Sequence, residues 1–82
     1  MTEYIATFWT HLAAISTLRT LRNAGVEAAA RPVPRMISSS CGTCVRYRAD
    51  TPCLSMLHRD YQQVAIVENG AYTVVAKNND AF

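Results

Sequence analysis

The sequence predicts one α+β domain in which two helices cover one face of an antiparallel sheet. Two helix-like segments alternate with short, β-branched stretches, and an Asn-Gly pair near the C-terminus is flanked by two more such stretches. Half of the residues are hydrophobic and only 17% are charged, a balance typical of a folded domain. A chain of 82 residues has room for one hydrophobic core, so residues 1–82 are expected to form a single domain.

The N-terminal segment is expected to form a strand followed by a helix. Residues 4–8 are short, β-branched and aromatic, as strands are, with three side chains on one face: Tyr4, Ala6 and Phe8. Thr10 can cap a helix over residues 11–24, and Gly25 gives a conventional stop. Apolar side chains recur at helical spacing in this segment: Leu12, Ile15, Leu18 and Leu21.

The middle of the chain is expected to add two strands. Residues 26–33 alternate weakly, and the prolines at 32 and 34 stop strand pairing, so this strand should end near Arg31 or Val33. A loop over residues 34–42 follows. Residues 43–48 then alternate as a third strand, with Val45 and Tyr47 on one face and three side chains on the other: Cys44, Arg46 and Arg48.

The C-terminal part is expected to form a second helix and a hairpin. The segment Asp50-Thr51-Pro52 favours a helix start, because threonine can cap and proline is tolerated at the first helical position. Leu54, Leu57 and Tyr61 would face inward from that helix. Residues 63–68 and 71–77 flank Asn69-Gly70, a strong hairpin signal.

This order of elements predicts a ferredoxin-like split βαβ two-layer sandwich, with both helices on one face of the sheet and a C-terminal hairpin. In that topology the first and second strands run parallel. The turn into the first helix and the loop after the second strand then lie at the same end of the sheet. His11 is therefore expected near residues 38–44, whereas the third strand carries the chain to the opposite end before Cys53.

Residues 31–48 carry the candidate chemistry. They contain Cys41-Gly-Thr-Cys44, three consecutive serines, four arginines and no acidic residue. A thiol acts as a nucleophile or group carrier mainly as the thiolate, which nearby positive charge favours. One interpretation is a single activated thiol at Cys41, helped by Arg35 or Arg46, with His11 as the base that accepts its proton.

Three other interpretations of this segment stay open. Cys41 and Cys44 have the spacing of a two-thiol site, although Cys44 also fits a small buried residue of the third strand. The chain also contains four residues of the types that bind zinc: Cys41, Cys44, Cys53 and His58. Their spacing is unusual and the topology separates them, so no metal is expected. The four arginines, with Trp9 and Tyr47, could form a groove for a nucleotide, tRNA or another anion.

Charge, hydropathy and cysteine count limit the classes of partner and compartment. The net charge of +2 is too small to indicate nucleic acid, which is not an expected partner. No apolar run reaches the roughly 18 residues of a membrane span, and the first residues lack the basic start of a signal peptide. Three cysteines are an odd count that argues against a disulfide framework. A cytoplasmic protein with reduced thiols and no membrane partner is therefore expected.

The stretch Arg31-Pro-Val-Pro-Arg-Met-Ile-Ser-Ser-Ser-Cys-Gly42 resembles a family of small, mostly bacterial proteins, the selenium/sulfur carrier-like proteins. Weaker resemblance lies in residues 4–8, 11–14 and 23–26. The resemblance implies a carrier thiol at Cys41 in a loop shaped by several neighbours: Arg35, Ser38, Ser39, Ser40 and Gly42. It also implies an ordinary apolar residue at the position of Cys44, and residues 64–75 extend beyond the usual ending of the family.

We therefore predict a carrier or accessory protein rather than a stand-alone enzyme, with no cofactor. Cys41 would receive sulfur or selenium from a donor enzyme such as a cysteine desulfurase, hold it as a persulfide or selenopersulfide, and pass it to an acceptor protein. The alternative is a small protein-interaction or ligand-sensing module in which Cys41 is incidental. In that case the exposed sheet face or the hairpin edge near Val74 and Val75 would bind a partner, a second copy of the chain included.

Overall fold

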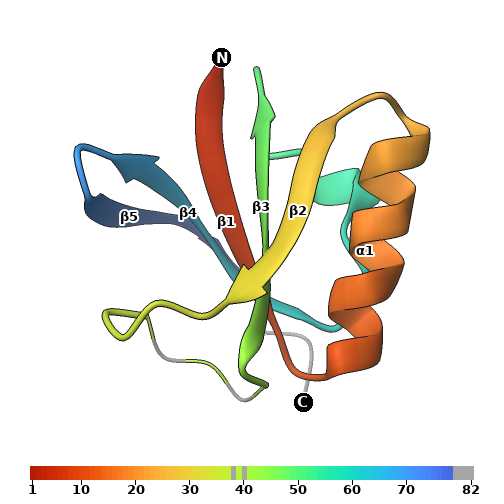
Figure 1. The fold of residues 1–82 in the computed structure, drawn as a ribbon, viewed down its shortest axis with the longest axis horizontal. Helices are drawn as coiled ribbons and strands as arrows, with labels where there is room; N and C mark the ends of the chain where they lie inside the picture. The colour runs from red at the N-terminus through yellow and green to blue at the C-terminus, as the bar shows by residue number, and fades with distance from the viewer. Residues whose placement is uncertain (38, 40, 79–82) are drawn as a thin grey trace.

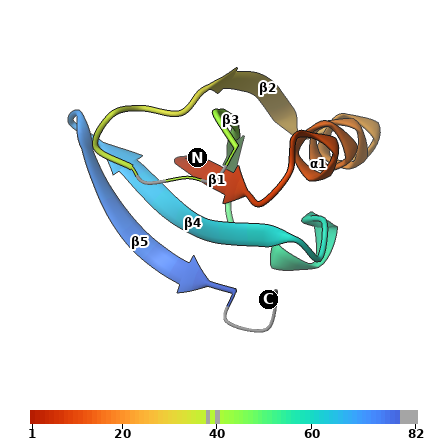
Figure 2. The same ribbon diagram turned by 90° about the horizontal axis from the view of Figure 1, so that it is seen from below.

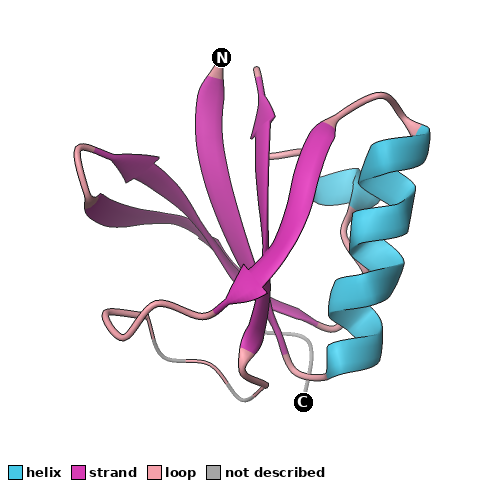
Figure 3. Cartoon of the chain, in the orientation of Figure 1, coloured by secondary structure: helices cyan, strands magenta, loops and turns pink. Residues whose placement is uncertain are grey.

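Five strands and one α-helix make up the part of the chain that this computed structural model describes, residues 1–37, 39 and 41–78. The elements are β1 (Thr2–Phe8), α1 (His11–Asn23), β2 (Glu27–Pro32), β3 (Thr43–Ala49), the 3-10 helix η1 (Leu54–Met56), β4 (Tyr61–Glu68) and β5 (Ala71–Lys77). The strands form one antiparallel sheet in the order β2-β3-β1-β4-β5. α1 packs against one face of this sheet (Figures 1 and 3).

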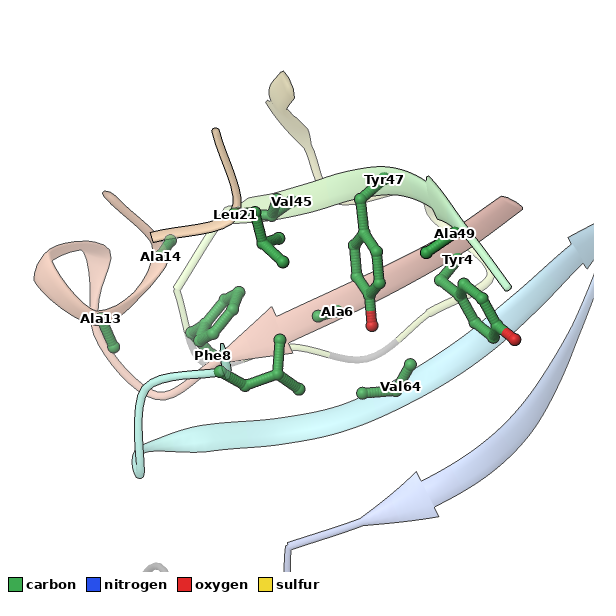
Figure 4. Packing of buried hydrophobic residues seen from close by; sticks show 11 residues of the cluster. Tyr4, Ala6, Phe8, Ala13, Ala14, Leu21, Val45, Tyr47, Ala49 and Val64 are labelled. Carbon is green, nitrogen blue, oxygen red and sulfur yellow. The ribbon is translucent and has the colours of Figure 1, made fainter. Parts of the chain in front are cut away.

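β1 is the central strand and is buried on both faces. It pairs with β3 on one side and with β4 on the other. As the alternation predicts, Tyr4, Ala6 and Phe8 lie in the core beneath α1, whereas Ile5 belongs to a second cluster on the opposite face. Figure 4 shows the core under α1, to which the helix contributes Leu21 and β3 contributes Val45 and Tyr47.

The predicted helix is confirmed, and Leu18 and Leu21 of its predicted apolar stripe pack in the core, but Leu12 does not. The Thr10 side chain caps α1 by accepting a hydrogen bond from the Ala13 N–H at 3.1 Å. The buried residues are Ala13, Ala14, Thr17 and Leu21, and Leu12 is 75% exposed. Two adjacent alanines let the first turn approach the sheet closely, so the buried stripe shifts by one residue from Leu12.

The predicted second helix does not form, so the two-helix, ferredoxin-like split βαβ sandwich is wrong for this chain. β3 and β4 run parallel to each other on either side of β1, so the eleven residues 50–60 must return along the sheet. An eleven-residue α-helix rises about 16 Å, less than the about 23 Å of a seven-residue strand. A mostly extended path with only the short η1 covers the distance.

The crossover between β3 and β4 lies on the same face of the sheet as α1 (Figure 2). The His58 backbone N–H donates to the buried Thr17 hydroxyl of α1 at 2.8 Å, and the Tyr47 hydroxyl donates to the Pro52 carbonyl. Leu57 is buried in the core beneath α1. The crossover therefore covers the face of the sheet that the second helix was expected to cover.

The C-terminal hairpin forms as predicted. Glu68 pairs with Ala71 across the two-residue turn Asn69-Gly70, and both turn residues have positive φ, 52° and 79°. Those angles match a type I′ turn, whose twist suits a β-hairpin. β4 begins at Tyr61, two residues before the predicted strand, and β5 forms one edge of the sheet.

The sheet face opposite α1 is partly covered by the loop that follows β2. Ile5, Cys44 and Ala65 are buried on this face, and Val33 and Ile37 of the loop pack against them. Figure 2 shows the chain that leaves β2 on the side of the sheet away from α1. We refer to residues 33–42 as the site loop. Among the described residues, no helix has the length and hydropathy needed to cross a bilayer.

Candidate functional site

The start of α1, the site loop and the start of β3 meet at one end of the sheet (Figure 1). β1 and β2 both run antiparallel to β3, so their C-terminal ends lie at the same end. His11, the first residue of α1, lies across from this loop, with its Nδ1 3.2 Å from the Thr43 hydroxyl oxygen. The predicted closeness of His11 to residues 38–44 is confirmed by this contact.

Cys41 is half-buried in a tight local turn. Its backbone N–H donates to the Ser39 hydroxyl oxygen at 3.3 Å, and its Sγ donates to the Thr43 carbonyl at 3.4 Å. The Thr43 N–H in turn donates to the Cys41 carbonyl. The side chain also packs against the core beneath α1. The thiol is thus held in place by its immediate neighbours, and the residue as a whole is partly exposed to solvent.

Cys44 has a different environment and lies in the cluster on the other face of the sheet. It is fully buried, and its Sγ lies 3.7 Å from the Pro32 carbonyl oxygen. Burial raises the pKa of the Cys44 thiol above its ordinary value of 9.0, against a smaller opposing effect of the Arg46 guanidinium. Cys44 is therefore a neutral, inaccessible thiol at pH 7, in agreement with its interpretation as a buried strand residue.

Cys53 lies beyond the far end of β3, in the crossover. It is half-buried, has a φ of 54°, and its Sγ donates to the Thr51 carbonyl at 3.4 Å. All three cysteines are free thiols. Among residues 1–37, 39 and 41–78, no three His, Cys, Asp or Glu side chains come together as metal ligands would. His58 instead accepts a hydrogen bond at Nδ1 from the Asp60 N–H at 3.0 Å.

The residues expected to shape the loop around Cys41 have separate roles. The Gly42 carbonyl accepts a hydrogen bond from the Val33 N–H at 3.1 Å, which closes the base of the loop, and Ser39 supports Cys41 as described above. Arg35 is exposed in a turn of the loop. Ser38 and Ser40 lie outside the described residues.

The arginines do not form a uniformly basic surface. Arg46 lies on the same face of β3 as Cys44 and makes a 2.5 Å ion pair with Glu3 of β1. Arg31, Arg46 and Arg48 share a surface pocket of about 270 Å³ with Glu3 and Glu27.

The predicted stacking surface for a nucleotide lacks one of its two aromatic residues. Tyr47 is buried beneath α1 and stacks on Tyr4, with ring centroids 5.4 Å apart. Its ring is therefore not accessible to a base. Together with the acids among the arginines, this placement disfavours the anion-groove interpretation.

Thr43 is the site residue that the sequence analysis did not single out. Its hydroxyl contacts His11 and its carbonyl accepts from the Cys41 thiol, so it connects the two candidate groups. Its position between the cysteines in Cys-Gly-Thr-Cys was the available signal. The strand start at residue 43 was predicted, but the sequence does not show that the Thr43 hydroxyl contacts His11.

Comparison with known proteins identifies the family. A family model described as "Putative Se/S carrier protein-like" matches residues 3–62, from β1 to the start of β4. The match includes His11, the site loop and all three cysteines, and it stops before most of the β4–β5 hairpin. No curated protein and no solved structure matches the chain. Because the matched segment covers well over half of its 82 residues, the chain belongs to the Se/S carrier-like protein family.

Proposed function

We propose that this protein carries sulfur or selenium between proteins as a persulfide or selenopersulfide on Cys41. The observation that carries the proposal is the contrast between the two thiols of the Cys-Gly-Thr-Cys segment. Cys41 is partly accessible at the end of the sheet, whereas Cys44 is sealed in a core and kept neutral by burial. The family to which the chain belongs supports the same function. We place the chemistry in the cytoplasm, where thiols stay reduced.

Loading is a thiol exchange that needs no external oxidant. The Cys41 thiolate attacks the outer sulfur of a persulfide on a donor enzyme such as a cysteine desulfurase. A new S–S bond forms at Cys41 as the S–S bond of the donor breaks, and its electron pair leaves with the donor as a thiolate. An acceptor thiolate then attacks the outer sulfur on Cys41 and releases the Cys41 thiolate. Selenium as the outer atom follows the same steps.

His11 is the proton acceptor in this proposal. Its imidazole is exposed and bonds to the Thr43 hydroxyl, next to the carbonyl that accepts from the Cys41 thiol. Histidine is the side chain best suited to exchange a proton near neutral pH. Arg46 is paired with Glu3, which leaves Arg35 as the exposed cation of the loop for an anionic persulfide.

The proposal is tested by loading the protein with a cysteine desulfurase and cysteine and recording its intact mass. Wild-type protein and Cys53→Ser are expected to gain the mass of one sulfur atom, and reduction should remove it. Cys41→Ser should gain none. Equal labelling of wild type and Cys41→Ser would overturn the proposal. Repeating the loading with selenocysteine as the donor compares the transfer of selenium with that of sulfur.

The protein-interaction alternative rests on a separate observation. β5 is an edge strand, and Val74 and Val75 on it are 45% and 43% exposed. An apolar strand with unpaired backbone groups is a template for pairing with another chain. Size-exclusion chromatography with mass detection should then show a dimer in wild type and in Cys41→Ser, but a monomer in Val75→Lys. A monomeric wild type would contradict self-association through β5.

A further inference from the structure

A second pocket lies under the site loop, on the face of the sheet opposite α1. Its volume is about 260 Å³. Thr7 of β1, Gln63 and Ala65 of β4 and Tyr72 of β5 line its sheet side, and Met36 and Ile37 of the loop cover it. None of the side chains that line it is charged. Such a pocket therefore suits an uncharged and mainly apolar group.

The side-chain hydroxyl of Thr7 is the feature of this pocket that the packing of the fold does not explain. Its side chain is on the face of β1 away from α1, and the residue is only 1% exposed. The hydroxyl oxygen is buried and has no hydrogen-bond partner among the described residues. A buried hydroxyl without a partner opposes folding, and a valine of the same shape would avoid that cost. A bound molecule that hydrogen-bonds to Thr7 would compensate the hydroxyl.

We propose that this pocket binds a small, uncharged, mainly apolar molecule that carries one hydroxyl or carbonyl group directed at Thr7. The size permits it, because an engineered apolar cavity of about 150 Å³ already binds benzene. Met36 is 72% exposed, and its flexible thioether side chain can adapt to the shape of an occupant.

The pocket is separate from the carrier thiol but shares the loop that holds it. Gln63, Ala65 and Tyr72 follow residue 62, so much of the wall lies beyond the segment that matches the family. The cover belongs to the site loop. The proposal does not depend on transfer chemistry at Cys41.

Phenol and toluene form a matched pair of probes, because they have similar size and only phenol carries a hydroxyl group. Titration of ¹⁵N-labelled protein with each should shift the amide signals of Thr7, Ala65 and Tyr72. Thr7→Val keeps the shape and removes the hydroxyl. It is expected to weaken phenol binding about fivefold relative to toluene binding, the usual size of one neutral hydrogen bond. Loading of Cys41 with sulfur should be unchanged in this variant.

A pocket-filling substitution provides the second test. Ala65→Leu fills the floor and should abolish the binding of both probes. Because Ala65 is buried, Val74→Trp at the more exposed wall is the companion variant if Ala65→Leu does not fold. The proposal is overturned if neither probe shifts the pocket amides of wild type, or if Thr7→Val changes phenol and toluene binding equally. Unchanged binding in a folded filling variant would also overturn it.

Discussion

The three cysteines have clearly different surroundings although two of them are only three positions apart. Cys41 lies in the site loop and packs toward the core beneath α1, whereas Cys44 lies in β3 and is buried on the opposite face with Ile5 and Ala65. A thiol reacts when a reagent can reach it and when it is ionised. Burial keeps reagents away from Cys44 and raises the pKa of its thiol.

Alkylation of the native protein should therefore be selective. We expect iodoacetamide to modify Cys41 and Cys53, and to modify Cys44 more than about tenfold more slowly, because Cys44 reacts only after the structure opens. Peptide mapping by mass spectrometry at successive times measures the three rates. In denaturant the rates should converge. Labelling of Cys44 as fast as Cys41 in the native protein would contradict its burial.

The raised pKa of Cys44 also predicts how stability depends on pH. The native state holds the Cys44 proton more tightly than the unfolded chain does, whose thiol has the ordinary pKa of 9.0. This contribution to stability is complete below the pKa of the unfolded chain and is lost as pH rises from there through the higher pKa of the native state. The free energy of unfolding should fall from about pH 9 upward. Urea unfolding of Cys44→Ala should show a shallower fall between about pH 9 and 10; identical slopes would refute the assignment.

At the scale of single elements, the turns and helix ends that local sequence signals determine were predicted. The segments whose form depends on where distant strands lie in the sheet were not. Asn69-Gly70 dictates its own turn, and Thr10 with Gly25 bounds α1. The second helix failed because the required length of the crossover depends on where β3 and β4 lie in the sheet. The covering of the second face by Val33 and Ile37 is likewise a tertiary contact that no local pattern signals.

The N-cap of α1 gives a prediction at the same scale. Thr10→Ala removes the acceptor for the Ala13 N–H and should lower the free energy of unfolding by about 1 kcal/mol. Thr10→Ser keeps an oxygen at the same position and should retain most of that stability. Urea denaturation followed by circular dichroism measures both variants. Equal stability of Thr10→Ala and wild type would show that the cap contributes nothing.

In the whole molecule, one end of the sheet gathers residues from distant parts of the sequence. Because β1 and β2 run parallel, the helix start with His11 lies beside the loop with Cys41, and Thr43 connects them. This meeting was predicted, because the expected topology makes the first and second strands parallel. The contact of Thr43 with His11, the pairing of Arg46 with Glu3 and the pocket beneath the loop were not predicted, because they depend on which side chains of different elements meet in the fold.

The location of the transferred atom tests the carrier proposal most directly. Wild-type protein loaded by a cysteine desulfurase can be alkylated on its persulfide, digested without reduction and mapped by mass spectrometry. We expect the additional sulfur on the peptide that contains Cys41, with Cys44 and Cys53 unmodified by sulfur. Additional sulfur on Cys53, or on no cysteine of a folded protein exposed to an active donor, would contradict the assignment of Cys41 as the carrier.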